Sequence, residues 1–239
     1  MVRERVAASV DQFDWARVLE RLLYLFPPVV GVGLVGVLQE ADPGVPGLGL
    51  AFVLIGTFGY AAVTLGVAVV IGFDAQQVRA RSGAEEETDD GSEVATADEW
   101  EPNPWLNALT ALVWAPAVGV VYLARRHRYR GTQAGWSGWW LVVALSLATT
   151  VVGVAVGLVA VVLAIPGLFT AAIGLAGAIA FGAFPVAIHQ DAAYVATTNE
   201  SWRPNPGTYL GLAFVSVFVP PVQPLLAGYY LTRRWRSVT

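Results

Sequence analysis

The sequence predicts an all-α integral membrane protein with six apolar segments arranged as two tandem three-segment repeats. The chain is 56% hydrophobic and 13% charged, whereas soluble domains carry about 25% charged residues. No Asp, Glu or Arg occurs from Gly131 to Gln190, which is enough chain for two bilayer crossings of about 20 residues each. One polar pattern also occurs twice, which indicates an internal repeat. It consists of Trp-x-Pro-Asn-Pro followed by Tyr-Leu-x-Arg-Arg, at Trp100–Pro104 with Tyr122–Arg126 and at Trp202–Pro206 with Tyr230–Arg234.

The predicted apolar segments are 19–39, 48–74, 104–124, 138–164, 167–189 and 207–232. They divide the chain into a cytoplasmic or interfacial lead-in at 1–18, a first repeat at 19–130 and a second repeat at 131–239. The first repeat contains a loop at 82–101 in which Glu85–Glu101 holds nine acidic residues and no basic one. That composition predicts a solvated, salt-adapted linker.

The second and fifth segments end alike, with Asp-Ala-x-x-Val beginning at Asp74 and at Asp191. Acids in membrane segments are candidates for binding a proton or a cation. The alternative is that each acid lies at the cytoplasmic interface and pairs with an arginine such as Arg79, Arg125 or Arg233. Their position at segment ends, where water is near, favours the ion pair.

The third and sixth segments contain prolines near their middle: Pro116 in the third, and Pro220, Pro221 and Pro224 in the sixth. Proline removes a backbone donor and clashes with the preceding turn, so each segment is expected to be broken. Two topologies remain open. Kinked full crossings would give inverted repeats of the kind that many transporters use. Re-entrant hairpins would place all 14 arginines on the cytoplasmic side, as positive-inside counting favours. Both topologies leave the N- and C-termini cytoplasmic.

The repeated Pro-Asn-Pro has a structural explanation that requires no ligand. Asn103 and Asn205 are predicted to cap the helices that follow them, with Pro104 and Pro206 at the first helical position. The repeat landmarks are Trp100, Pro102, Asn103, Pro104, Trp202, Pro204, Asn205 and Pro206. The arginines that close each repeat are predicted to contact anionic lipid headgroups. They are Arg125, Arg126, Arg128, Arg130, Arg233, Arg234 and Arg236.

Composition argues against most enzyme chemistry. The chain has no cysteine and no lysine, and its only histidines are His127 and His189. Thiolate and Schiff-base catalysis are therefore excluded, and two histidines fall short of the three or more ligands of a zinc site. No catalytic, cofactor or metal site is predicted, and His127 is expected to contact a headgroup.

The predicted function is that of a non-enzymatic polytopic membrane protein: a scaffold, an accessory subunit or a lipid-interacting component. The alternative is a small transporter or channel built on the internal repeat, with Asp74 and Asp191 at its cytoplasmic mouth and Gln223 lining it. The expected partners are a bilayer with anionic headgroups and either another membrane protein or a second copy of the chain. Nucleic acid is not expected.

The order Asp-Ala-x-x-Val, Trp-x-Pro-Asn-Pro, Tyr-Leu-x-Arg-Arg-His resembles motifs of small, uncharacterised multi-pass membrane proteins of haloarchaea. The resemblance covers roughly residues 69–130 and 186–236, and the lack of lysine beside an acid-rich loop is also typical of haloarchaeal proteins. It implies a lineage and an architecture; the expected location, argued from composition, is the cell membrane. It implies no site residues, because no activity is assigned to that family. The second copy has Trp235 where the first has His127, which argues against a role for this histidine.

Overall fold

The computed structural model describes residues 13–41, 47–86 and 100–238, and these residues form helices without any strand. Most of the predicted lead-in, the loop at 42–46 and the acidic stretch at 87–99 lie outside the described residues. Among the described residues, four helical stretches are long and apolar enough to cross a membrane: Trp15–Leu38, Leu48–Ser82, Pro104–Arg130 and Trp139–Val162. The prediction of an all-helical protein with membrane-type helices is thus confirmed, while the count of six segments stays a prediction.

The chain divides into two compact units. The first unit comprises the residues up to Phe26 together with Phe58–Leu123, and the second comprises Pro27–Thr57 together with Ala124–Thr239. Helices α3 (Phe26–Ala41), α4 (Leu48–Glu86) and α5 (Pro104–Arg130) each include residues of both units.

The first unit begins with α2 (Trp15–Leu23), a short amphipathic helix. Its first turn is capped by the side chain of Asp14, which accepts a hydrogen bond from the backbone N–H of Arg17 at 3.2 Å. Leu19 and Leu23 are fully buried. The Trp15 ring stacks on Phe73 of α4 with ring centroids 4.9 Å apart. Helix α2 therefore packs its apolar face inward, against α4.

Helix α4 continues to Glu86, twelve residues past the predicted end of the second apolar segment. The added turns are rich in Ala, Gln, Arg and Glu, which are strong helix formers, and no proline interrupts them. Hydropathy marks where the apolar stretch ends, but it does not mark where the helix ends. As a consequence Asp74 lies inside a helix rather than at its terminus.

Helix α5 is broken where the prolines predict it. Trp114 has a non-helical backbone (φ −150°, ψ 74°) two residues before Pro116. The proline ring crowds the preceding turn and cannot supply an amide donor. The backbone relieves this crowding by leaving the helical conformation at Trp114.

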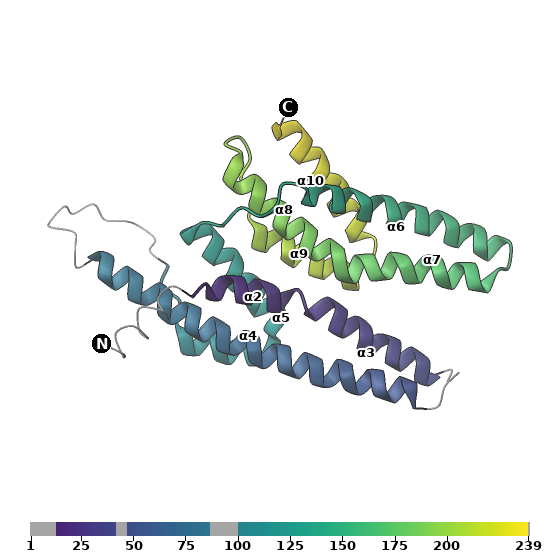
Figure 1. Cartoon of the computed structure of the whole chain (residues 1–239), viewed down its shortest axis with the longest axis horizontal. Coiled ribbons are helices and arrows are strands. Elements are labelled where there is room, and N and C mark those ends of the chain that lie inside the picture. Colours follow the sequence, from purple (N-terminus) through teal and green to yellow (C-terminus); the bar gives the residue numbers. More distant parts are fainter. Residues whose placement is uncertain (1–12, 42–46, 87–99, 239) are drawn as a thin grey trace. The chain divides into compact units, whose positions relative to one another are not determined.

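In the second unit α6 (Trp139–Val162) and α7 (Pro166–Ala178) run side by side in opposite directions (Figure 1). After α7 the helical path continues through a π-helical turn, η1 (Ile179–Ala183), into α8 (Phe184–Thr198). Pro185 follows this turn, and its missing amide is a common reason for a local change of helical bonding.

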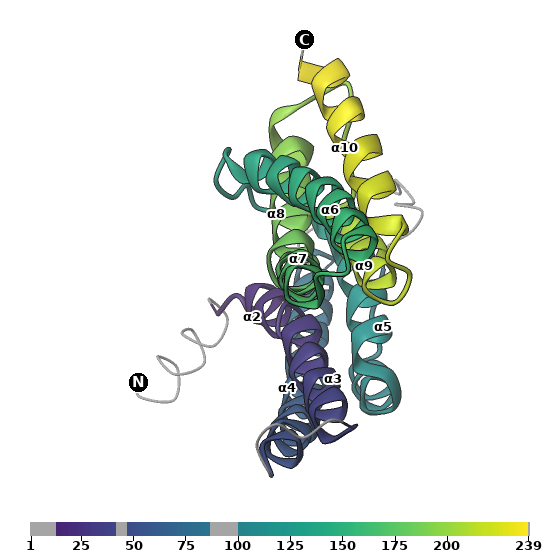
Figure 2. The ribbon, with the colours of Figure 1, turned by 90° about the vertical axis from the view of Figure 1, so that its right-hand side faces the viewer.

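The sixth predicted segment forms two helices, α9 (Pro206–Phe218) and α10 (Val222–Val238), which fold back on each other. The backbone leaves the helical conformation at Val219 (φ −125°, ψ 80°), just before two consecutive prolines. The rings of Tyr209 on α9 and Tyr230 on α10 lie only 5.0 Å apart. A straight helix would separate these two residues by about 32 Å. The segment is therefore a helical hairpin, and Figure 2 shows α10 returning from the end of α9.

The core of the second unit lies among α6, α8, α9 and α10. Its buried members are Val143, Phe184, Ala187, Ile188, Ala192, Tyr209, Ala213, Leu226, Ala227 and Tyr230. The two tyrosines are the only residues in this group with a polar side-chain atom. The Tyr230 hydroxyl donates a hydrogen bond to a buried acid, Asp191.

Candidate functional site

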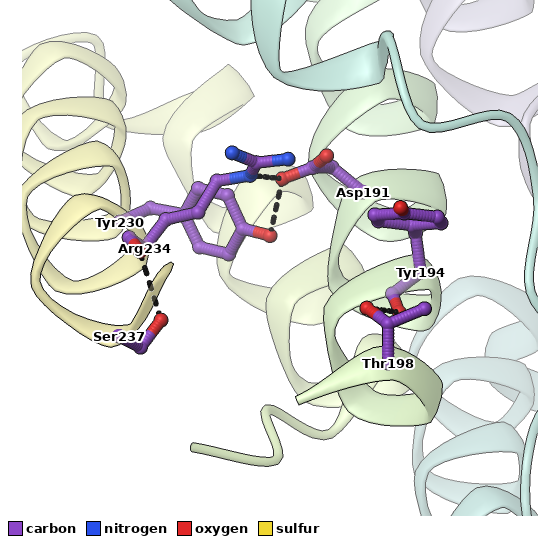
Figure 3. A network of polar contacts seen from close by, with 6 residues as sticks. All are labelled: Asp191, Tyr194, Thr198, Tyr230, Arg234 and Ser237. Atoms are coloured by element: carbon purple, nitrogen blue, oxygen red, sulfur yellow. Dashed lines mark hydrogen bonds and ion pairs between the residues drawn. The ribbon is translucent and has the colours of Figure 1, made fainter. Parts of the chain in front are cut away.

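Asp191 on α8 is fully buried, with 0% of its surface exposed, and one of its oxygens receives two donors from α10. The Tyr230 hydroxyl donates to Asp191 Oδ2 at 2.7 Å, and Arg234 Nε donates to the same oxygen at 2.7 Å (Figure 3). Tyr230 and Arg234 lie four residues apart, so they occupy one face of α10. Together the three residues tie α8 to α10, and we call them the Asp191 clasp.

Aromatic rings surround the Asp191 clasp. Trp202 lies 5.5 Å from the Tyr230 ring between centroids, and the Arg234 guanidinium lies 5.6 Å from the centre of the Trp140 ring. Arg234 itself is only 15% exposed at its side chain. Hydrogen bonds and ion pairs in such a water-poor setting are stronger than at a surface, and losing one partner is correspondingly costly.

The first unit holds a matching pair. Asp74 on α4 is also 0% exposed, and the Tyr122 hydroxyl donates to its Oδ2 at 2.8 Å. Trp100 lies 5.2 Å from the Tyr122 ring at an interplanar angle of 60°, and the Trp202–Tyr230 pair has 5.5 Å and 52°. The tyrosine in each case is the one that opens Tyr-Leu-x-Arg-Arg, and the tryptophan is the one that opens Trp-x-Pro-Asn-Pro.

The predicted helix caps are confirmed. Asn103 Oδ1 accepts from the backbone N–H of Leu106 at 3.1 Å, and Asn205 Oδ1 accepts from that of Thr208 at 3.2 Å. Pro104 opens α5 and Pro206 opens α9. All four motif prolines are buried: Pro102, Pro104, Pro204 and Pro206.

Asn205 has a second role that the sequence did not reveal. Its Nδ2 donates to the backbone carbonyl of Ala124 at 2.7 Å. Gly207 lies so close to the same residue that a Cβ there would come within 2.5 Å of Ala124 N. The last turns of α5 are therefore held against the start of α9 within the second unit.

The structure corrects two expectations about the acids. They were expected near water, yet neither Asp74 nor Asp191 is exposed. An ion pair with an arginine was expected for the acids, with Arg79, Arg125 and Arg233 as examples; Asp191 makes such a pair, but with Arg234. The reason is helical spacing: Arg234 shares a face with Tyr230, whereas the exposed Arg233 lies 5.9 Å from the Trp202 ring.

The predicted headgroup arginines differ in exposure. Arg125 and Arg128 at the end of α5 are exposed, as are Arg233 and Arg236 near the end of α10, and all four belong to the second unit. Arg126, Arg130 and Arg234 are half-buried. Of these, Arg234 forms an ion pair with the buried Asp191.

The second unit also contains a buried glutamine. Gln223, near the hairpin turn, is 1% exposed, and its Oε1 accepts from the Thr150 hydroxyl at 2.8 Å. Gln223 Nε2 and Asp191 Oδ1 are buried and make no hydrogen bond in the structure. The Thr150 hydroxyl also lies 2.9 Å from the carbonyl oxygen of Ser146. A hydroxyl has only one proton, so its hydrogen bonds to Gln223 and to Ser146 share that proton.

The structure also brings together His127, at the end of α5, and His189, on α8. They are 8% and 0% exposed, and their ring centroids are 5.6 Å apart. Sequence reasoning treated them separately and expected His127 at a lipid headgroup. No local pattern links residues so far apart in the chain, and their approach depends on the docking of α5 against α9.

Comparison of the chain with protein-family models, curated proteins and solved structures gives no match. The functional argument therefore rests on the geometry of the site.

Proposed function

We propose that the protein is a non-enzymatic polytopic component of the cell membrane that binds anionic lipid headgroups and acts as a scaffold or accessory subunit. The observation that carries this proposal is the Asp191 clasp. An acid that carries a substrate must exchange its partners, whereas this carboxylate is held by a hydroxyl and by a cation on the same oxygen. Its charge is used to join two helices.

The proposal includes an internal repeat. Its support is that Asp74 and Asp191 each bind the tyrosine of their own copy of the motif, at 2.8 and 2.7 Å. The caps and the tryptophan contacts recur in the same order. Two halves in which a buried acid makes the same helix-to-helix contact with a tyrosine are expected of a duplicated structural unit.

We also propose the re-entrant topology, in which the third and sixth segments enter and leave the bilayer on the same side. The fold-back of α9 onto α10 supports it, since a hairpin begins and ends on one side of the bilayer. The non-helical residue Trp114 supports the same arrangement for α5. Both termini and all arginines would then be cytoplasmic, in agreement with the positive-inside rule.

Lipid binding is proposed for the exposed arginines Arg125, Arg128, Arg233 and Arg236. A basic residue near an anionic membrane surface contributes about 1 kcal/mol. They lie at the ends of α5 and α10, and all four belong to the second unit.

The test is thermal unfolding of the purified protein during titration with phosphatidylglycerol, with phosphatidylcholine as the control lipid. We expect phosphatidylglycerol alone to raise the melting temperature, and this gain to disappear when the four exposed arginines are changed to Gln. If phosphatidylglycerol raised the melting temperature of the fourfold variant as much as that of the wild-type protein, these arginines would not be the headgroup-binding residues.

A small transporter or channel is the second candidate. Two observations favour it: the buried Asp191 Oδ1 and Gln223 Nε2 make no hydrogen bond in the structure, and helix breaks occur in both α5 and the α9–α10 hairpin. Flux of ions or small solutes into proteoliposomes tests it. A transporter would lose flux in Gln223→Leu while it remains folded, whereas a scaffold would show no flux above that of empty vesicles.

A further inference from the structure

We propose that His127 and His189 bind a divalent transition-metal ion. The two rings come from different helices, their centroids are 5.6 Å apart, and one ligand nitrogen of each lies within 4.8 Å of the other. Imidazole bonds to zinc are about 2.0–2.1 Å long, so two nitrogens on one metal are at most about 4.2 Å apart. A small side-chain adjustment brings the pair to that separation.

The His127 ring is oriented by the end of its own helix. Gly131 has a positive φ of 74°, a conformation that glycine adopts without strain. Its carbonyl oxygen lies 3.4 Å from His127 Nδ1. A carbonyl can only accept, so this contact is a hydrogen bond in the tautomer that carries the proton on Nδ1, and in that tautomer Nε2 is the nitrogen able to bind a metal. Metal-binding histidines generally donate their second nitrogen to a carbonyl or carboxylate in this way.

His189 lies on α8. The residue is fully buried and follows the buried core residues Ala187 and Ile188. The end of α5, which carries His127, is held by the hydrogen bond from Asn205 to Ala124. Both ligands are therefore placed by packed helices, as a defined metal site requires.

The chemistry of the pair selects the class of ion. Imidazole nitrogens suit copper, nickel and zinc, with affinity rising towards copper. Calcium and magnesium prefer oxygen ligands. A core pair of neutral histidines is the alternative, and it would show no metal-dependent property. Two imidazoles leave coordination positions for water or other oxygen donors, so an exchangeable ion is expected.

The test uses untagged full-length protein with Cu²⁺, read by electron paramagnetic resonance. The chain has no cysteine and no other histidine, so every imidazole nitrogen on the copper must come from this pair. We expect one Cu²⁺ per monomeric protein with the hyperfine pattern of two imidazole nitrogens. His127→Asn and His189→Asn should each leave one nitrogen and weaken affinity at least about tenfold, because even outer-sphere partners contribute that much.

Several results would overturn the site. A spectrum without nitrogen coupling would place the metal on carboxylates. Coupling to a single nitrogen in the wild-type protein would exclude binding by both histidines. One copper shared by two chains would exclude a site within one chain. The wild-type spectrum alone decides the nitrogen count, so the test does not depend on the variants folding. Thermal unfolding without metal checks that the Asn variants keep the fold.

Discussion

At the residue scale the most consequential contact is the one between Arg234 and Asp191. Removing the arginine leaves a fully buried carboxylate with only the Tyr230 hydroxyl as a described donor to Oδ2. Breaking a buried ion pair by losing one partner is strongly destabilising. We therefore expect Arg234→Gln to lower the free energy of unfolding by about 3 kcal/mol.

The neighbouring Arg233 offers a matched control. It carries the same charge, is exposed, and contacts the Trp202 ring at 5.9 Å. Arg233→Gln is expected to cost less than about 1 kcal/mol. Denaturant unfolding in detergent micelles measures the free energy of unfolding of both variants. Similar losses in the two would show that the ion pair in the Asp191 clasp does not contribute more to stability than a surface arginine.

The matched tyrosines give a prediction that bears on the repeat. Tyr122→Phe and Tyr230→Phe each remove one hydroxyl donor from a buried carboxylate without changing the ring. Each is expected to cost about 1 kcal/mol. Tyr229→Phe, at an exposed neighbouring position, should be neutral. Equal losses at 122 and 230, measured by the same unfolding experiment, support two equivalent contacts; a loss at only one of them would break the equivalence.

Residue-level prediction succeeded where chemistry is local. Asn103 and Asn205 could be assigned as caps because a cap involves residues only a few positions apart. An arginine partner was expected for the acids and Asp191 has one, but Arg234 was not among the arginines named, because the choice between neighbours depends on which helix face meets α8. The approach of His127 and His189 had no sequence signal at all, since it follows from helix docking.

At the element scale the prolines predicted where the third and sixth segments break, but they did not decide between a kink and a hairpin. That choice depends on whether the two arms attract each other. In the sixth segment they do, through Tyr209 and Tyr230, which are paired across the turn at a ring separation of 5.0 Å. The hydropathy of the two arms is the same in either arrangement.

The hairpin can be measured with two spin labels. Thr208 near the start of α9 and Thr232 in α10 are both exposed, and the cysteine-free chain allows labels at these positions alone. A straight helix would separate the two positions by about 36 Å. We expect a double electron–electron resonance distance well below this value in lipid nanodiscs, and a distribution centred near 36 Å would contradict the fold-back.

At the scale of the whole molecule, composition and charge spacing sufficed to predict an all-helical protein with membrane-type helices. They did not predict the division into two compact units. The reason is that α3, α4 and α5 each contribute to both units, whereas a sequence repeat is read in chain order. Apolar helices can pair in many ways with similar burial, so the pairing is decided by small-residue contacts and by a few polar ties.

The membrane topology follows from whether the α5 region crosses. Arg79 near the end of α4 and Arg128 near the end of α5 are exposed, and so is Ile165 in the turn between α6 and α7. If α5 re-enters, Arg79 and Arg128 face the cytoplasm and Ile165 faces the exterior. If α5 crosses, Arg128 moves to the exterior while Arg79 and Ile165 share the cytoplasmic side.

Single cysteines at these three positions, probed with a membrane-impermeant maleimide in intact cells and in inside-out vesicles, separate the two cases. We expect Arg79→Cys and Arg128→Cys to label together from the cytoplasmic side and Ile165→Cys to label from outside. The physical reason is that four arginines in the stretch 125–130 would otherwise be moved across the bilayer, against the positive-inside bias. Shared labelling of positions 79 and 165 would instead establish that α5 crosses the bilayer and would overturn the re-entrant topology proposed for it.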